Sequence, residues 1–130
     1  MKFVKLSIIA LLMPVCLLAC KKDSKAASPV EGKWSGVYGN DNDIPTILYK
    51  LNIKPGGIIE EINAAGEVKG TGTWSLKGNT FVAHYQWKAP LNTFFTIAAT
   101  FDPATNKLTG TWGFDNSATD GGKWEVIKTN

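Results

Sequence analysis

Few side chains in this sequence could carry out chemistry, and they lie far apart. His84 is the only histidine, and the only two cysteines, Cys16 and Cys20, lie in an apolar N-terminal stretch. Zinc sites are built from cysteine and histidine ligands that converge from several positions. A lone histidine, on the polar face of a predicted strand, does not favour a zinc site. The absence of cysteine after residue 20 excludes a cysteine nucleophile from the rest of the chain.

Carboxylates occur in two predicted loops, where they could bind a hard cation. Asp41-Asn42-Asp43 lies in one loop, and Asp115 and Asp120 lie in another. Calcium prefers such oxygen ligands, but this spacing matches no calcium-loop pattern and lacks the distal glutamate. The sequence also has no defensible Ser/His/Asp grouping or phosphate-cradling glycine loop. We therefore expect two solvated loops, no metal or cofactor, and no enzyme activity.

The N-terminal residues have the parts of an export signal. A basic start is followed by an apolar run from Leu6 to Leu18, which is too short to cross a bilayer as a helix. The run ends in Leu17-Leu18-Ala19-Cys20, which resembles the lipobox of bacterial lipoproteins. In that family the lipobox thiol takes a diacylglycerol and the chain is cut just before it. The resemblance implies a signal peptide over residues 1–19 and lipidation of Cys20, with acyl chains such as palmitate.

The remaining chain divides into a short tether and one small domain. Residues 20–29 are small and polar and predict a flexible tether, and residues 30–130 form the domain. Lys21 follows the cysteine, and by resemblance to lipoprotein sorting rules this implies the outer membrane, on its periplasmic side or at the cell surface. Without the lysines of the signal, 12 lysines face 11 acids, and there is no arginine. Such a balance does not favour nucleic-acid binding.

The sequence of the domain predicts short strands separated by turn residues, and it has no helical periodicity. The predicted strands span residues 33–39, 46–54, 57–63, 68–76, 79–87, 93–101, 107–114 and 122–128. Every linker is short enough to join antiparallel neighbours. Closure removes both exposed edges, and eight strands enclose an interior that side chains fill or that holds one small ligand. The sequence predicts an all-β, eight-stranded antiparallel up-and-down β-barrel, with a two-sheet sandwich as the alternative.

Alternation along these strands assigns one face to the barrel interior. The aromatic residues on this face are candidate ligand-binding residues: Tyr38, Tyr49, Trp74, Tyr85, Trp87, Phe95 and Trp112. The tyrosine hydroxyls are the best polar candidates among them. Val82, His84 and Phe94 are expected to face outward, and one of Glu60 and Glu61 to point inward near a rim. The interior also has many small residues, which could leave a cavity or admit neighbouring rings, so whether it is hollow stays open.

A Gly-x-Trp pattern occurs four times, ending at Trp34, Trp74, Trp112 and Trp124. We interpret each glycine as room for a large ring on the same strand face. Gly32-Lys33-Trp34 is similar to the signature of the lipocalins, and the stretch from Gly72 to Thr80 resembles a hairpin of bacterial lipocalin-like lipoproteins. The resemblance implies a lipocalin-like (calycin) barrel whose closed end is plugged by Trp34. Lys123 or Lys128 would replace the usual arginine over that ring, and avidin-type barrels share the pattern.

The loops divide between the two barrel ends. Loops 40–44, 63–67, 88–92 and 115–121 share one end and are richly polar, so we expect this end to be open. The tether would then lie at the plugged end, and the open mouth would face away from the membrane. These features lead to two hypotheses. The first is an anchored lipoprotein that binds a small apolar or amphipathic ligand; the second is a solid-cored barrel that acts as a protein-interaction or structural lipoprotein of the cell envelope. An exported hydrolase inhibitor is a third option, without a motif to support it.

Overall fold

A computed structural model describes residues 27–130 of the chain. It contains eight strands and one 3₁₀ turn: β1 (Gly32–Tyr38), β2 (Ile47–Lys54), η2 (Pro55–Gly57), β3 (Ile58–Ile62), β4 (Val68–Lys77), β5 (Thr80–Trp87), β6 (Phe94–Asp102), β7 (Lys107–Phe114) and β8 (Gly122–Lys128). Each predicted strand is present, with its ends within about one residue of the prediction. The predicted signal peptide, Cys20 and the first part of the tether lie outside the described residues. Over residues 27–130, no helix has the length and apolar character needed to span a membrane.

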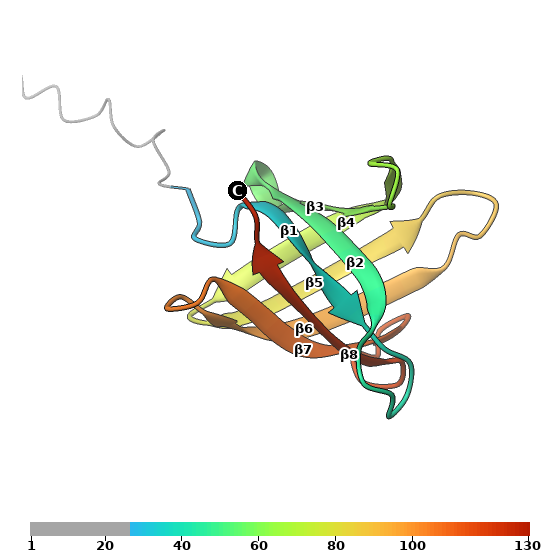
Figure 1. Ribbon diagram of the computed structural model, residues 1–130. Coiled ribbons are helices and arrows are strands. Elements are labelled where there is room, and N and C mark those ends of the chain that lie inside the picture. Colours follow the sequence, from blue (N-terminus) through green and yellow to red (C-terminus); the bar gives the residue numbers. More distant parts are fainter. Residues whose placement is uncertain (1–26) are drawn as a thin grey trace, which may run out of the picture.

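The strands close into a barrel in simple sequence order (Figure 1). Each strand pairs antiparallel with the next, and β8 pairs with β1 from Trp34↔Lys128 to Tyr38↔Trp124. Because β1 and β8 are joined, neither has a free edge. The all-β up-and-down barrel is therefore confirmed, and the sandwich alternative is wrong.

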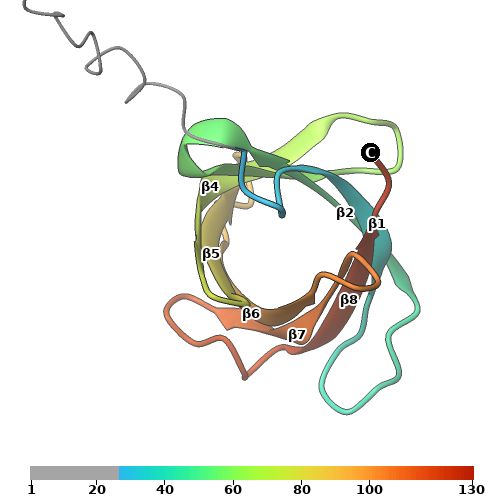
Figure 2. The same cartoon turned by 90° about the vertical axis from the view of Figure 1, so that its left-hand side faces the viewer.

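One end of the barrel is filled by side chains and by the chain that leads into β1. Val30 is fully buried, and its carbonyl accepts a hydrogen bond of 2.8 Å from the indole Nε1 of Trp34. The Trp34 ring meets Phe101 edge to face, with centroids 6.2 Å apart. Figure 2 looks along the barrel and shows this leading segment turning into its opening. We call this the closed end; the turns after β2, β4 and β6 lie here as well.

Two glycines of the repeated pattern have a different role from the one we expected. A Cβ on Gly72 would collide with the backbone oxygen of His84, and a Cβ on Gly110 would collide with that of Ala98. The atoms that require glycine therefore belong to the neighbouring strand's backbone, not to the following tryptophan ring. Close approach of strand backbones is a known reason for glycine inside a strand.

Candidate binding pocket at the open end

The interior of the barrel is hollow at the end opposite Trp34. A pocket of about 310 Å³ opens there, lined by Tyr38, Asn40, Tyr49, Glu61, Tyr85, Trp87, Thr93, Phe95, Trp112 and Phe114. The lining is mostly aromatic, with a few polar groups, which is the usual composition of a small-molecule site. The barrel is thus packed in one half and hollow in the other, which answers the question that the sequence left open.

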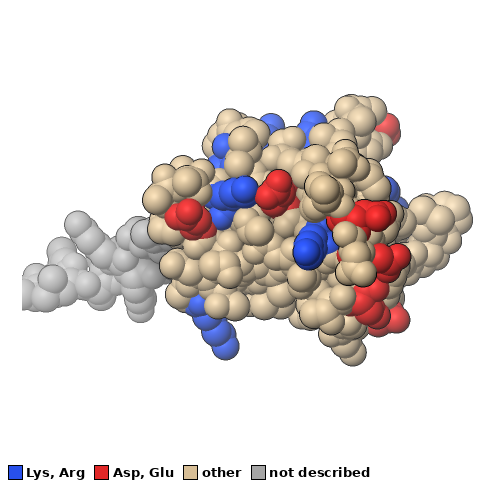
Figure 3. Space-filling model, turned by 60° about the horizontal axis from the view of Figure 1, so that its bottom comes forward, with Lys and Arg blue, Asp and Glu red and all other residues tan. Residues whose placement is uncertain are grey.

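The loops around the pocket mouth carry mostly negative charge. They contain five exposed carboxylates, Asp41, Asp43, Glu67, Asp115 and Asp120, and a single lysine, Lys88. Figure 3 shows acidic side chains gathered at one end of the barrel. A cleft lined by one sign of charge raises the local concentration of ions of the opposite sign. The mouth therefore favours the approach of cations.

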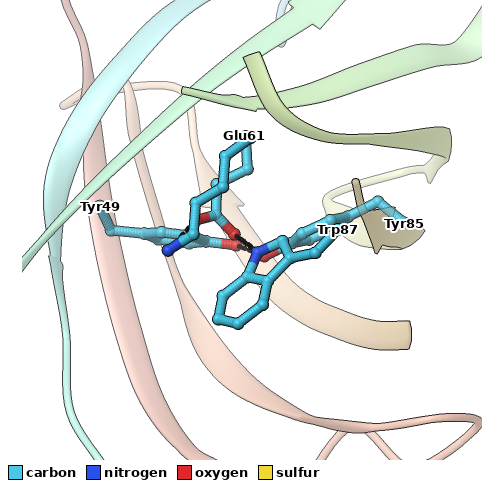
Figure 4. A network of polar contacts seen from close by, with 5 residues as sticks. Tyr49, Glu61, Tyr85 and Trp87 are labelled. Carbon is cyan, nitrogen blue, oxygen red and sulfur yellow. Dashed lines mark hydrogen bonds and ion pairs between the residues drawn. The ribbon is translucent and has the colours of Figure 1, made fainter. Parts of the chain in front are cut away.

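A buried carboxylate lies at the centre of the pocket's polar groups (Figure 4). Glu61 is only 7% exposed, and its Oε1 accepts hydrogen bonds from the Tyr85 hydroxyl at 2.7 Å and from the Trp87 indole Nε1 at 2.9 Å. The Tyr49 and Tyr85 hydroxyls are 2.8 Å apart. Because Tyr85 donates its proton to Glu61, Tyr49 is the donor in that second contact. The result is a directed chain of hydrogen bonds from Tyr49 through Tyr85 to Glu61.

The register of three strands brings Glu61 and Trp87 together. Gly70 on β4 pairs with Glu61 on β3 and with Trp87 on β5. A Cβ on Gly70 would lie 3.1 Å from the Trp87 ring atom Cδ1 and 2.8 Å from the Gln86 oxygen. The indole of Trp87 can therefore reach Glu61 because the residue between them has no side chain. The strand pairing also shifts between Glu61 and Ile62, at the mouth end of β3.

Lys69 approaches Glu61 beside this glycine. Its Nζ is 3.6 Å from Glu61 Oε2 and 4.0 Å from the centroid of the Trp87 ring. The Lys69 side chain is 38% exposed, so solvent screens the ion pair on its outer side. Among residues 27–130 no hydrogen bond reaches Glu61 Oε2, and this long ion pair is the contact that we find there.

Burial keeps the two inner tyrosines protonated. It raises the pKa of Tyr49 and of Tyr85 well above their ordinary value of 10.0. The charge of Glu61 raises the pKa of both further, because a phenolate would be repelled by the carboxylate. Both hydroxyls therefore remain donors at neutral pH. The pKa of Tyr38 is also raised, by burial first and then by Glu61.

Aromatic contacts hold the pocket wall in place. The Trp112 ring meets Tyr38 and Phe114 edge to face, at centroid distances of 5.8 Å and 5.3 Å. Its indole Nε1 donates a 2.9 Å hydrogen bond to the carbonyl of Gly39, in the loop after β1. Trp112 therefore ties a pocket ring to the mouth loop, and its position is determined before any ligand binds.

Six of the seven residues predicted to bind ligand line this one pocket: Tyr38, Tyr49, Tyr85, Trp87, Phe95 and Trp112. Trp74 does not. It stacks on Phe81 with centroids 6.1 Å apart and donates a 2.9 Å hydrogen bond to the carbonyl of Lys54, at the closed end. It shares the inner strand face with the other six but lies too far along β4 to reach the mouth. Strand alternation identifies the face of a residue and not its depth.

Sequence reasoning missed two important lining residues. Glu61 was expected near a rim and is buried instead, because it shares the inner face of β3 with Ile59, two residues earlier. Phe114 shares its face with Trp112, and the same period of two could have identified it. A carboxylate inside an aromatic wall is hard to predict from one sequence, because the donors that stabilise it come from another strand.

The closed end differs from the prediction in one detail. Trp34 is 1% exposed and plugs this end, but Lys123 is exposed and lies near the open end, where its carbonyl accepts a hydrogen bond from Gly39. Lys123 alternates with the buried Trp124, so its side chain points outward. Lys128 is the lysine at the closed end; it pairs with Trp34 in register, and its Nζ lies 3.2 Å from the carbonyl of Pro29. The last residues of the predicted tether are therefore in contact with the barrel.

Other residues singled out from the sequence lie on the outside. His84 is exposed and its Nδ1 lies 2.8 Å from the Thr96 hydroxyl, and Phe94 is 53% exposed. Val82 is half-buried. Asp120 accepts a hydrogen bond from the backbone of Phe114 and so orders its own loop. In the part of the chain that the structure describes, no three histidine, cysteine or acidic side chains converge as metal ligands.

Comparisons with known proteins do not name a relative for this chain. No protein-family model matches the chain, and the searches of curated proteins and of solved structures found no match. What can be concluded about function therefore comes from the pocket itself.

Proposed function

We propose that this protein is a membrane-anchored, lipocalin-like lipoprotein that binds a small molecule in its open-end pocket. The observation that carries the proposal is the cavity of about 310 Å³ with its aromatic wall. A cavity of this size is at the small end of the range for ligand sites, about 300–1,000 Å³. The wall suits the apolar part of a ligand, and Glu61, Asn40 and Thr93 suit its polar part.

The proposed role is binding without catalysis. Glu61 is the one ionisable carboxyl among the described lining residues, and its Oε1 is held by two donors. General acid–base chemistry usually needs a second group within reach of the same substrate proton. His84, the obvious candidate, is exposed on the outer face of β5.

Binding can be tested with an apolar fluorescent probe such as N-phenyl-1-naphthylamine. Phe114 lines the pocket and is 43% exposed, whereas Ile58 is 41% exposed at the closed end. We expect Phe114→Ala to weaken probe binding and Ile58→Ala, the matched control, to leave it unchanged. Extraction of the protein purified from its own membranes, followed by mass spectrometry, should yield a bound small molecule. Failure of both tests would overturn the proposal.

The proposed anchor is lipid on Cys20, with the protein in the cell envelope, at the outer membrane. We expect metabolic labelling with palmitate in the wild-type protein and none in Cys20→Ser. The segment before β1 leads into the closed end, so the open mouth should face away from the membrane (Figure 1). Spin labels placed at Asn42 and Asn116 should then remain in water, and labels buried in lipid would contradict this orientation.

Exposed apolar side chains near the mouth favour a second candidate function, the binding of a partner protein. Ile44 is 82% exposed and Leu91 is 62% exposed, each in a different mouth loop, and the exposed Phe94 begins β6 after the loop that contains Leu91. Apolar patches on a surface often mark interaction sites. If a partner covers this rim, Phe94→Ser should release it while probe binding in the pocket persists.

A further inference from the structure

We infer that the natural ligand of the pocket carries a positively charged head, of the alkylammonium class, next to an apolar body. This inference rests on the proposed function, since it specifies which small molecule the pocket selects. It follows from three features: the buried carboxylate of Glu61, the aromatic wall around it, and the acidic mouth.

The carboxylate supplies the first argument. Glu61 is about nine-tenths buried, yet its Oε2 has only the 3.6 Å contact to Lys69. The two hydrogen bonds to Oε1 position the group and leave the second oxygen available. Lys69 already pairs with this charge, but at 3.6 Å it makes no hydrogen bond to Oε2, so a charged donor from a ligand would add a charge-assisted hydrogen bond that Oε2 lacks among residues 27–130. An anionic ligand, such as a fatty carboxylate, would instead meet like charge in a poorly solvated site.

The aromatic wall supplies the second argument. Tyr38, Tyr49, Tyr85, Trp87 and Trp112 all line the cavity together with Glu61. Ring faces attract cations, and clustered rings are the common way to bind quaternary ammonium groups. The protein already has one example, because the ammonium of Lys69 lies 4.0 Å from the Trp87 ring centroid and 3.6 Å from Glu61. Glu61 and Trp87 therefore form a place that accommodates a cation.

The mouth supplies the third argument. Its loops contain five exposed carboxylates and one lysine, so a cation is attracted before it enters. Two strand lysines, Lys69 and Lys123, also lie at this end, where carboxylates still outnumber lysines. Lys54 and Lys77 lie at the closed-end turns. The approach to the pocket and its interior thus select the same sign of charge.

Lys69 then has a defined part in this selection. It is not among the lining residues and its side chain is 38% exposed, so it contacts Glu61 from outside the cavity. A ligand cation would share Glu61 with Lys69 and would be repelled by it. Removal of the lysine charge should therefore strengthen cation binding, whereas removal of the glutamate charge should weaken it.

The experiment uses three probes with the same hexyl body: hexyltrimethylammonium, hexan-1-ol and hexanoate. Binding to the wild-type protein, Glu61→Gln and Lys69→Met is measured by isothermal titration calorimetry and by tryptophan fluorescence. For the wild type we expect the cation to bind roughly tenfold more tightly than the alcohol, and hexanoate to bind more weakly than either. Glu61→Gln should remove this preference, and Lys69→Met should increase it.

The outcomes separate the inference from the proposed function. If none of the three probes binds, the proposed function itself fails. If the alcohol or hexanoate binds as well as the cation, the pocket binds ligands but the inference is overturned. If the two residues had a purely structural role, both variants would weaken the binding of all three probes to the same extent. That result would also overturn the inference. Circular dichroism of each variant identifies any that has not folded.

Discussion

The two ends of the barrel are made by the same eight strands but pack in opposite ways. At the closed end Trp34 is 1% exposed, and its indole N–H reaches the carbonyl of Val30 from the segment before β1. At the open end Trp112 is only half-buried and lies beside a cavity of about 310 Å³. Within residues 27–130 the chain fills one end of the barrel and leaves the other end open. The same Gly-x-Trp pattern therefore places one tryptophan in a packed core and another on the wall of a pocket.

We expect the largest loss of stability from a substitution at the closed end. Trp34→Ala should lower the free energy of unfolding by about 3–5 kcal/mol, because it opens a cavity among fully buried side chains. Trp112→Ala should cost clearly less, since its ring already borders an empty space. Urea denaturation of both variants measures the contrast. Equal losses would show that the two ends contribute alike to stability.

The second largest effect should come from the chain of hydrogen bonds that runs from Tyr49 through Tyr85 to Glu61. Tyr85→Phe removes a donor to Glu61 and the acceptor for Tyr49, and should cost about 1–3 kcal/mol of stability. Tyr38→Phe is the control, because no hydrogen bond of the Tyr38 hydroxyl occurs within residues 27–130. Thermal and chemical unfolding compare them. A similar cost for both variants would mean that the network contributes little.

A smaller effect should appear at alkaline pH. The pKa values of Tyr49 and Tyr85 are raised in the folded state, so their stabilising contribution is fully present below the ordinary value of 10.0 and is lost as pH rises beyond it. The unfolded chain then loses protons that the folded chain retains, at up to about 1.4 kcal/mol per pH unit for each tyrosine. Unfolding in urea between pH 9 and pH 11 should show a steeper loss in wild type than in Tyr49→Phe/Tyr85→Phe. Equal slopes would contradict the assigned burial.

The smallest effect concerns the rim. Ile44→Ser should change stability by less than about 0.5 kcal/mol, because its side chain is 82% exposed. Differential scanning calorimetry can detect a larger change. A loss above about 1 kcal/mol would mean that the mouth loops pack more tightly than their exposure indicates.

The sequence predicted the strand face of the site residues but not their position along the barrel axis. The inner face of Tyr85 and Phe95 followed from strand alternation, and both line the pocket. The depth of Trp74 did not follow, because alternation says nothing about distance along the barrel axis. Lys123 was placed at the wrong end for the same reason. The interior position of Glu61 was considered, but its burial was not predicted.

Local sequence patterns were enough to predict the fold and the faces of its strands, since a period of two and short turn sequences leave few other arrangements for eight antiparallel strands. The location of the hollow part of the barrel became evident only from the three-dimensional structure. That depends on the register, which sets Gly70 between Glu61 and Trp87, and on the segment around Val30, which fills only one end. Register and end-filling arise from contacts between residues distant in the chain, and local sequence patterns carry no information about those contacts.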